Sequence, residues 1–364
     1  MMLGPERVER ACAELEGRLC EPGGEFTDSA TILGRATALA RLGLMMLASD
    51  HPPLGSLMAG ARTVPGLLEG MLMRPSVRAE ISRQLAARGR GELPSERRAT
   101  FDTALAALAE PTAAAEADAA ADADGSWSPS VLGPDEPNPL DWAMLEMIRA
   151  ICAGHGRPSV RIVEAGARER GALLEAEAIL EETVPSLWHA TRDHTRAIVL
   201  LDDPPFGSCT LRTLPGVTML STELLQDPAD LAEAILHEAV HDKLADLCAY
   251  LPVLPVGYSD DTSPRLLCPP WREDQAFAGG GWPVWVVLSA AHVYVHLIVL
   301  RGRNDVEASR PTGVDATAHE RADFLTAGLL RPDVAQSLRE KGGAIAAWLR
   351  ASFEAWEAVA TGEA

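Results

Sequence analysis

Apolar residues recur at helical spacing through the first part of the chain. Apolar and charged residues alternate every three or four positions over 5–19, and an Ala- and Leu-rich segment follows over 29–49. Shorter segments with the same period cover 64–73, 76–87 and 95–109. Because a helix buries one face with this period, we expect helices throughout this region.

Composition divides the chain into three parts, the first being a helical N-terminal region over 1–110. Residues 111–125 are almost entirely Ala, Asp and Glu, and 127–139 are rich in Pro, Ser and Gly. Such a sequence cannot build a core, so we predict an acidic Ala/Pro-rich linker or surface loop over 111–139. An exposed helix is the alternative for its Ala-rich half. The third part, 140–364, is predicted to be the catalytic domain.

Patterns typical of helices and patterns typical of strands both occur in this third part. Helical spacing is found over 140–153, 169–182, 284–300 and 334–359, and short apolar runs that indicate buried strands lie at 159–164, 197–201 and 217–221. The expected fold is therefore mainly α with a small β component, an α+β fold.

One predicted helix carries the residues with the clearest chemistry. It should begin at Asp227-Pro228, because Asp is a favoured N-cap and Pro a favoured first helical residue, and it should end near Tyr250. His237 and His241 are four residues apart in this helix, so their side chains project from the same face and can share one ion.

Glu238 completes a His-Glu-x-x-His motif. It is one residue beyond His237 and so points about 100° away from it. A carboxylate at this place can orient a ligand on the metal or handle its protons. The alternative is a chance match in which both histidines are satisfied core residues. We favour the metal site because the motif lies in the middle of a well-capped helix.

A third ligand is needed, and the sequence offers more than one. A metzincin would have Gly and His where this chain has Leu244 and Leu247, so that class is excluded. For a glutamate ligand of the thermolysin type the nearest downstream candidate is Glu273, which lies in a loop-like segment. His292 and His296, four apart on the helix predicted over 284–300, are better candidates.

The net charge of −20, from 52 acidic and 32 basic residues, argues against general binding to nucleic acid or to an anionic membrane. Hydrophobic residues make up 47% of the 364 positions, enough for a substantial core. Such a surface suits a soluble protein and would tolerate a cationic peptide partner.

Cysteine usage and the N-terminal sequence indicate a cytoplasmic protein. The cysteines are scattered and form no CxxC pair, and no basic segment followed by an apolar run precedes the first helix. The apolar segment 284–300 is long enough to suggest a membrane span, but its two histidines suit a buried functional helix better. The cysteines are Cys12, Cys20, Cys152, Cys209, Cys248 and Cys268.

Residues 230–300 resemble a bacterial family of HExxH-type, 2-oxoglutarate-dependent peptide β-hydroxylases, also found fused to radical-SAM peptide maturases. The resemblance lies in the motif 237–241 with the Lys-Leu after it, in Pro-Trp-Arg at 270–272 with Asp274, in Gly281, and in the Val-Tyr-Val-His segment 293–296. The chain departs from the family at Ala239, where an aromatic residue is common.

This resemblance implies that His237, His241 and His296 bind Fe(II), and that Arg272 pairs with the distal carboxylate of 2-oxoglutarate. An arginine suits that role because its charge is permanent and its fork is bidentate. The implied reaction is the O2-dependent hydroxylation of a side-chain carbon, at the β position, in a ribosomally made precursor peptide. Glu238 would then orient a ligand from beside the iron.

Two other hypotheses remain. A zinc peptidase would use Glu238 as the general base of a metal-bound water, with His292 or Arg272 stabilising the transition state. A binding module with a vestigial site would use the N-terminal helices to capture a leader peptide; peptide capture or a homodimer is the hypothesis for that region.

Overall fold

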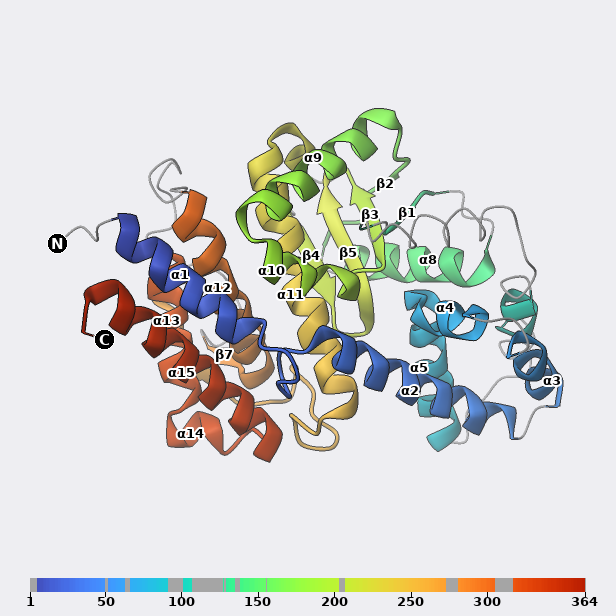
Figure 1. The fold of residues 1–364 in the computed structure, drawn as a ribbon. Helices are drawn as coiled ribbons and strands as arrows, with labels where there is room; N and C mark the ends of the chain where they lie inside the picture. Colours follow the sequence, from blue (N-terminus) through green and yellow to red (C-terminus); the bar gives the residue numbers. More distant parts are fainter. Residues whose placement is uncertain are drawn as a thin grey trace. The chain divides into compact units, whose positions relative to one another are not determined.

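The computed structural model describes residues 5–49, 52–62, 66–90, 101–106, 127, 129–134, 138–154, 156–202, 207–272, 281–304 and 317–363. The chain divides into two compact units, each built from separate stretches of sequence (Figure 1). The helical unit comprises Met1–Ile32, Leu180–Thr191 and Lys243–Ala364, and the sheet unit comprises Leu33–Ile179 and Arg192–Asp242. Each unit is described by itself below.

A five-stranded mixed sheet forms the centre of the sheet unit, in the order β1-β3-β5-β4. β3 is parallel to β1 and to β5, while β4 is antiparallel to β5 and the short β2 is antiparallel to β3. Every residue of β3 is buried, as expected for a parallel strand covered on both faces. The strands are β1 (Ser130–Leu132), β2 (Ile162–Val163), β3 (Ala197–Leu201), β4 (Ser208–Leu211) and β5 (Leu214–Ser221).

Helices pack on this sheet and form a second core beside it. α5 packs against β5 and α8, and α3, α4 and α5 follow one another in contact. The core beside the sheet includes Leu72, Ile81 and Phe101. The helices of this unit are α2 (Ser29–Ala48), α3 (Pro52–Ala61), α4 (Leu67–Met73), α5 (Pro75–Gly89), α8 (Pro139–Gly154) and α9 (Ala167–Thr183), with the 3-10 turns η1 (Arg192–His194) and η3 (Thr222–Gln226).

The helical unit is built around α12 (Val284–Asn304), which contacts α1, α13 and α15 (Figure 1). α1 approaches α12 so closely that a Cβ at Gly302 would lie 2.7 Å from Cys12 Sγ, so only glycine fits there. The other elements are α1 (Pro5–Leu19), α10 (Pro185–His189), β6 (Arg265–Leu267), η4 (Pro270–Arg272), β7 (Trp282–Pro283), α13 (Ala318–Leu329), α14 (Pro332–Ala335) and α15 (Glu340–Thr361).

The predicted fold class is confirmed, because the described residues are mainly helical with two small sheets. The helix predicted over 5–19 and the strand predicted over 197–201 have the expected bounds. The division by sequence into 1–110, 111–139 and 140–364 stays a prediction, and 107–126 lie outside the described residues. The compact units instead interleave in sequence.

The prediction of one closing helix over 334–359 is wrong. α14 ends at Ala335 and α15 begins at Glu340, because Arg339 is extended (φ −82°, ψ 174°) and its N–H donates to Val253 O. α13, which precedes them, was not predicted. It begins with a capping box in which Thr317 and Glu320 each accept the other's backbone N–H.

Two of the described helices, α2 and α12, are long and apolar enough to cross a membrane by length and composition alone. In α12 the most apolar window is 78% buried inside the protein, which is also typical of a core helix. In α2 that window is 28% buried.

Candidate metal centre

The motif helix, α11 (Pro228–Tyr250), begins where the sequence predicts. Asp227 Oδ1 accepts hydrogen bonds from the backbone N–H groups of Ala229 (2.9 Å) and Asp230 (3.3 Å), and Pro228 takes the first helical position. The apolar side chains of the helix, including Leu236 and Val240, are buried. α11 runs through both units, and the whole His-Glu-x-x-His motif lies in its part within the sheet unit.

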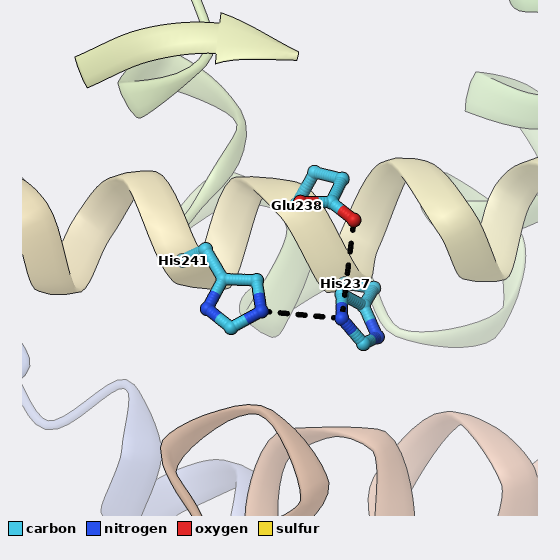
Figure 2. Close-up of side chains that lie close together, drawn as sticks. All are labelled: His237, Glu238 and His241. Atoms are coloured by element: carbon cyan, nitrogen blue, oxygen red, sulfur yellow. Dashed lines mark hydrogen bonds and ion pairs between the residues drawn. The ribbon is translucent and has the colours of Figure 1, made fainter. Parts of the chain in front are cut away.

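His237 and His241 turn the same ring nitrogen toward each other (Figure 2). Their Nε2 atoms are 3.2 Å apart. Two nitrogens bound to one ion at about 2.1 Å, with an angle of about 90–110° between them, would be roughly 3.0–3.4 Å apart. With Glu238 they form a group whose ligand atoms all lie within 4.8 Å of one another. The pair therefore fits a mononuclear metal site.

The electrostatics around His241 favour the form that binds metal. Burial, and then the neighbouring His237, lower the pKa of His241 well below its ordinary value. A neutral imidazole keeps a lone pair for an ion. The His237 side chain keeps 30% of its surface exposed, so a small ligand can reach that edge of the pair.

Glu238 lies beside the histidines, on the side of α11 that faces the sheet. Its Oε1 is 3.9 Å from His237 Nε2 (Figure 2). The same oxygen accepts a 2.7 Å hydrogen bond from the hydroxyl of Ser208 on β4. Burial raises the pKa of Glu238 to about 7, against the lowering effect of hydrogen bonds from Ser208 and Thr210. The carboxyl is thus held in place by β4 and poised to take or give a proton.

Asp242, the residue after His241, holds the motif helix in place. Its carboxylate is buried and accepts hydrogen bonds from the Thr195 hydroxyl (2.9 Å) and from the backbone N–H of Gly216 (2.8 Å). Gly216, in β5, has φ +84°, and a Cβ there would lie 3.2 Å from His194 O, so the strand position that presents this N–H requires glycine. The bonds of Asp242 therefore hold the motif segment of α11 against the first part of β5.

Sequence reasoning missed both Ser208 and Asp242. Ser208 is 30 residues from Glu238 and belongs to no recognisable motif. Its contact with Glu238 depends on the antiparallel pairing of β4 with β5, which the sequence does not reveal. For Asp242 a signal existed, because an acid directly after the motif, in a helix predicted to be largely buried, requires hydrogen-bond partners.

The other two predicted histidines lie within the helical unit, on α12. His296 is fully buried, and its Nδ1 lies 2.6 Å from His292 O, while its Nε2 has no hydrogen-bond partner. Burial, and then the charge of Lys243, lower the pKa of His296 to about 3. Lys243 is itself buried, with Nζ 2.9 Å from Thr27 O, and burial lowers its pKa to about 8. Both α12 rings lie near Trp348, at centroid distances of 6.2 and 6.5 Å.

Arg272, predicted to bind 2-oxoglutarate, ends the 3-10 turn η4 in the helical unit; its side chain lies outside the described part of the structure. Glu273 and Asp274 lie outside the described residues as well. The described structure therefore brings together His237, Glu238 and His241, while His296 and Arg272 keep their predicted roles from the sequence. The chain matches no model of a known protein family and has no significant match among curated proteins.

Proposed function

We propose that this chain is an Fe(II)- and 2-oxoglutarate-dependent oxygenase that hydroxylates a side-chain carbon, at the β position, of a ribosomally made peptide. The observation that carries the metal-dependent part is the facing pair of Nε2 atoms on His237 and His241, 3.2 Å apart beside a buried carboxyl group. The iron, the co-substrate and the peptide come from the sequence resemblance in 230–300.

Each residue of the motif has a defined part in this proposal. His237 and His241 hold the ion through Nε2, and His296 is the proposed third ligand. A 2-oxoglutarate-bound Fe(II) supplies the oxidation of an unactivated C–H bond by O2. Glu238, held by Ser208, accepts a hydrogen bond from a ligand on the ion and keeps that ligand oriented. Arg272 pairs with the distal carboxylate of the co-substrate.

The substrate and the setting follow from charge and composition. A chain with net charge −20 attracts a cationic peptide and repels phosphate backbones, so the proposed partner is a precursor peptide and not a nucleic acid. The free cysteines suit a reducing compartment, and we propose the cytoplasm. A homodimer remains the proposed role for the helical N-terminal region.

A zinc peptidase is the second candidate, and the position of Glu238 also suits it. Its Oε1 lies 3.9 Å from His237 Nε2, close enough to accept a proton from a water on the ion. In this role His237 and His241 hold zinc, which supplies a polarised water, and Glu238 is the general base. The same carboxyl group serves both candidates, so geometry at Glu238 alone does not separate them.

Anaerobic reconstitution with Fe(II), followed by 2-oxoglutarate, separates the two. The oxygenase should develop the visible metal-to-ligand charge-transfer band of a chelated 2-oxo acid, and His237→Ala should abolish it. His189→Ala is the control, because this exposed histidine pairs with Glu181 in the helical unit. If no band forms and the purified protein holds zinc tightly, the oxygenase is refuted. Peptide cleavage that Glu238→Gln abolishes would then support the peptidase.

A further inference from the structure

A cluster of an arginine and three aromatic rings lies in the helical unit, apart from the His-Glu-x-x-His motif in sequence. The guanidinium of Arg321, on α13, lies over the rings of Trp271 (5.5 Å) and Tyr294 (5.1 Å), and its Nη1 donates to Tyr294 Oη at 2.6 Å. Trp271 also packs edge-on against Phe324, at a centroid distance of 5.4 Å. The two rings and the hydrogen bond to Tyr294 therefore restrict the orientation of the Arg321 fork.

Two hydrogen-bond donors in this cluster are buried without an acceptor. They are Nε of Arg321 and Nε1 of Trp271, neither of which has a hydrogen-bond partner among the residues that the structure describes. Within the part of the chain that the structure describes, no carboxylate forms an ion pair with Arg321. An unmade hydrogen bond at a buried donor is destabilising, so a folded protein rarely leaves two of them in one cluster without an occupant.

Arg350, on α15, is a stacked arginine whose guanidinium does form ion pairs and hydrogen bonds. Its guanidinium lies over Phe353 at 5.5 Å, as that of Arg321 lies over its rings. It also donates to Asp323 (2.6 Å) and to Glu354 (2.7 Å), so both its charge and its donors are satisfied within the unit. In a chain with 52 acidic and 32 basic residues, such pairing is easily available. Its absence at Arg321 therefore requires an explanation.

We propose that Arg321 and the Nε1–H of Trp271 bind a carboxylate group of a ligand. A carboxylate has the planar pair of oxygens that suits an arginine fork, and it can accept from the indole N–H as well. The aromatic faces of Trp271 and Tyr294 lower the local exposure to water, which strengthens charged hydrogen bonds. Arg321 is thus the anchor of the site, and Trp271 a second donor.

Two sources of this carboxylate are compatible with the chemistry: a small dicarboxylate such as 2-oxoglutarate, and an acidic side chain of a peptide. Trp271 directly precedes Arg272, the residue proposed to bind the co-substrate. The choice of 2-oxoglutarate as the dicarboxylate rests on the proposed function, whereas the carboxylate site itself does not. A titration without metal therefore tests the site independently of any oxygenase activity.

The test is isothermal titration calorimetry of the full chain in the presence of a chelator, with 2-oxoglutarate in one arm and the amide of N-acetylglutamate in the other. Arg321→Gln should raise the Kd roughly 10- to 100-fold, the loss expected for a charged hydrogen-bonded pair. Arg321→Lys, which keeps the charge but not the fork, and Trp271→Phe, which keeps the ring but not the N–H, should each cause a smaller rise. Arg350→Gln is the matched control and should leave the Kd unchanged.

Each outcome decides the proposal. Binding of either probe that depends on Arg321 and Trp271 supports it, and the arm that binds identifies the source of the carboxylate. Failure of both probes to bind, or a Kd that is the same in all variants, overturns it and leaves the cluster as a packing contact. Binding of both probes that is lost in Arg272→Gln but not in Arg321→Gln also overturns it. None of these results depends on the iron charge-transfer band, so the proposed function can fail separately.

Discussion

The Nε2 atoms of His237 and His241, four residues apart on α11, lie 3.2 Å from each other. Two imidazoles at this distance offer an ion two ligands that the helix has already oriented, so binding requires little rearrangement. The next turn on this face is occupied by Leu244, which cannot bind a metal. This face of the helix therefore supplies two histidine ligands, and the proposed third histidine, His296, comes from another element.

Replacing either histidine of this pair should abolish tight metal binding. We expect His237→Ala and His241→Ala each to lower the affinity for the metal by at least ~100-fold. This is the largest loss usually seen when a residue that only hydrogen-bonds to a metal ligand is removed, and a ligand itself should cost at least as much. The measurement is metal content after dialysis, or competition against a chromogenic chelator. His189→Ala should keep the affinity of the unmodified chain. Equal affinity in His237→Ala would contradict the assignment of the site.

The two histidines of α12 should differ in their effect on metal retention. His296 directs Nδ1 at the carbonyl of His292, which fixes the tautomer and leaves the buried Nε2 with a lone pair and no hydrogen-bond partner. We therefore expect His296→Ala to abolish metal retention and His292→Ala to weaken it less. Metal analysis of the two purified variants checks this, and the reverse order would refute the choice of His296.

The motif helix shows why its position could be predicted from the sequence. Its start at Pro228 and its buried face depend on capping and on helical period, both of which are local signals. The i, i+4 pair follows from the same local geometry. The prediction of a mainly α fold succeeded for this reason, since most of the chain has that period.

The supporting residues could not be predicted in the same way. The bond from Ser208 to Glu238 depends on how β4 pairs with β5, and that register is set by tertiary packing. The break at Arg339 depends on a hydrogen bond to Val253, 86 positions earlier, although helical period continues across it. Long-range contacts of this kind leave no pattern in the surrounding sequence.

Removing the carboxylate of Asp242 should destabilise the fold strongly. In Asp242→Ala the N–H of Gly216 and the hydroxyl of Thr195 lose their buried acceptor, which should lower the free energy of unfolding by about 2–4 kcal/mol. Asp242→Asn keeps one acceptor oxygen and should lose less. Chemical denaturation measures the change. Asp230→Ala, in the exposed first turn of the same helix, is the control and should cost under ~1 kcal/mol. An equal cost at both positions would show that Asp242 does not hold the helix.

Tyr258 should make the stability of the chain dependent on alkaline pH. Its hydroxyl accepts the N–H of Trp285 at the start of α12 (3.1 Å) and donates to Asp260 (2.8 Å). Burial is the main cause that raises the pKa of Tyr258 to about 12, from 10.0 for an ordinary tyrosine. The folded chain therefore keeps this proton at a pH where the unfolded chain has lost it. By linkage, the stabilising effect of the hydroxyl is complete below pH 10.0 and is lost as the pH rises toward about 12.

We expect Tyr258→Phe to be less stable than the unmodified chain at neutral pH, by about 1 kcal/mol. The difference between the two, measured by urea denaturation at increasing pH, should shrink above pH 10.0. A difference that stays constant over that range would show that the hydroxyl is not held in its protonated form by the fold.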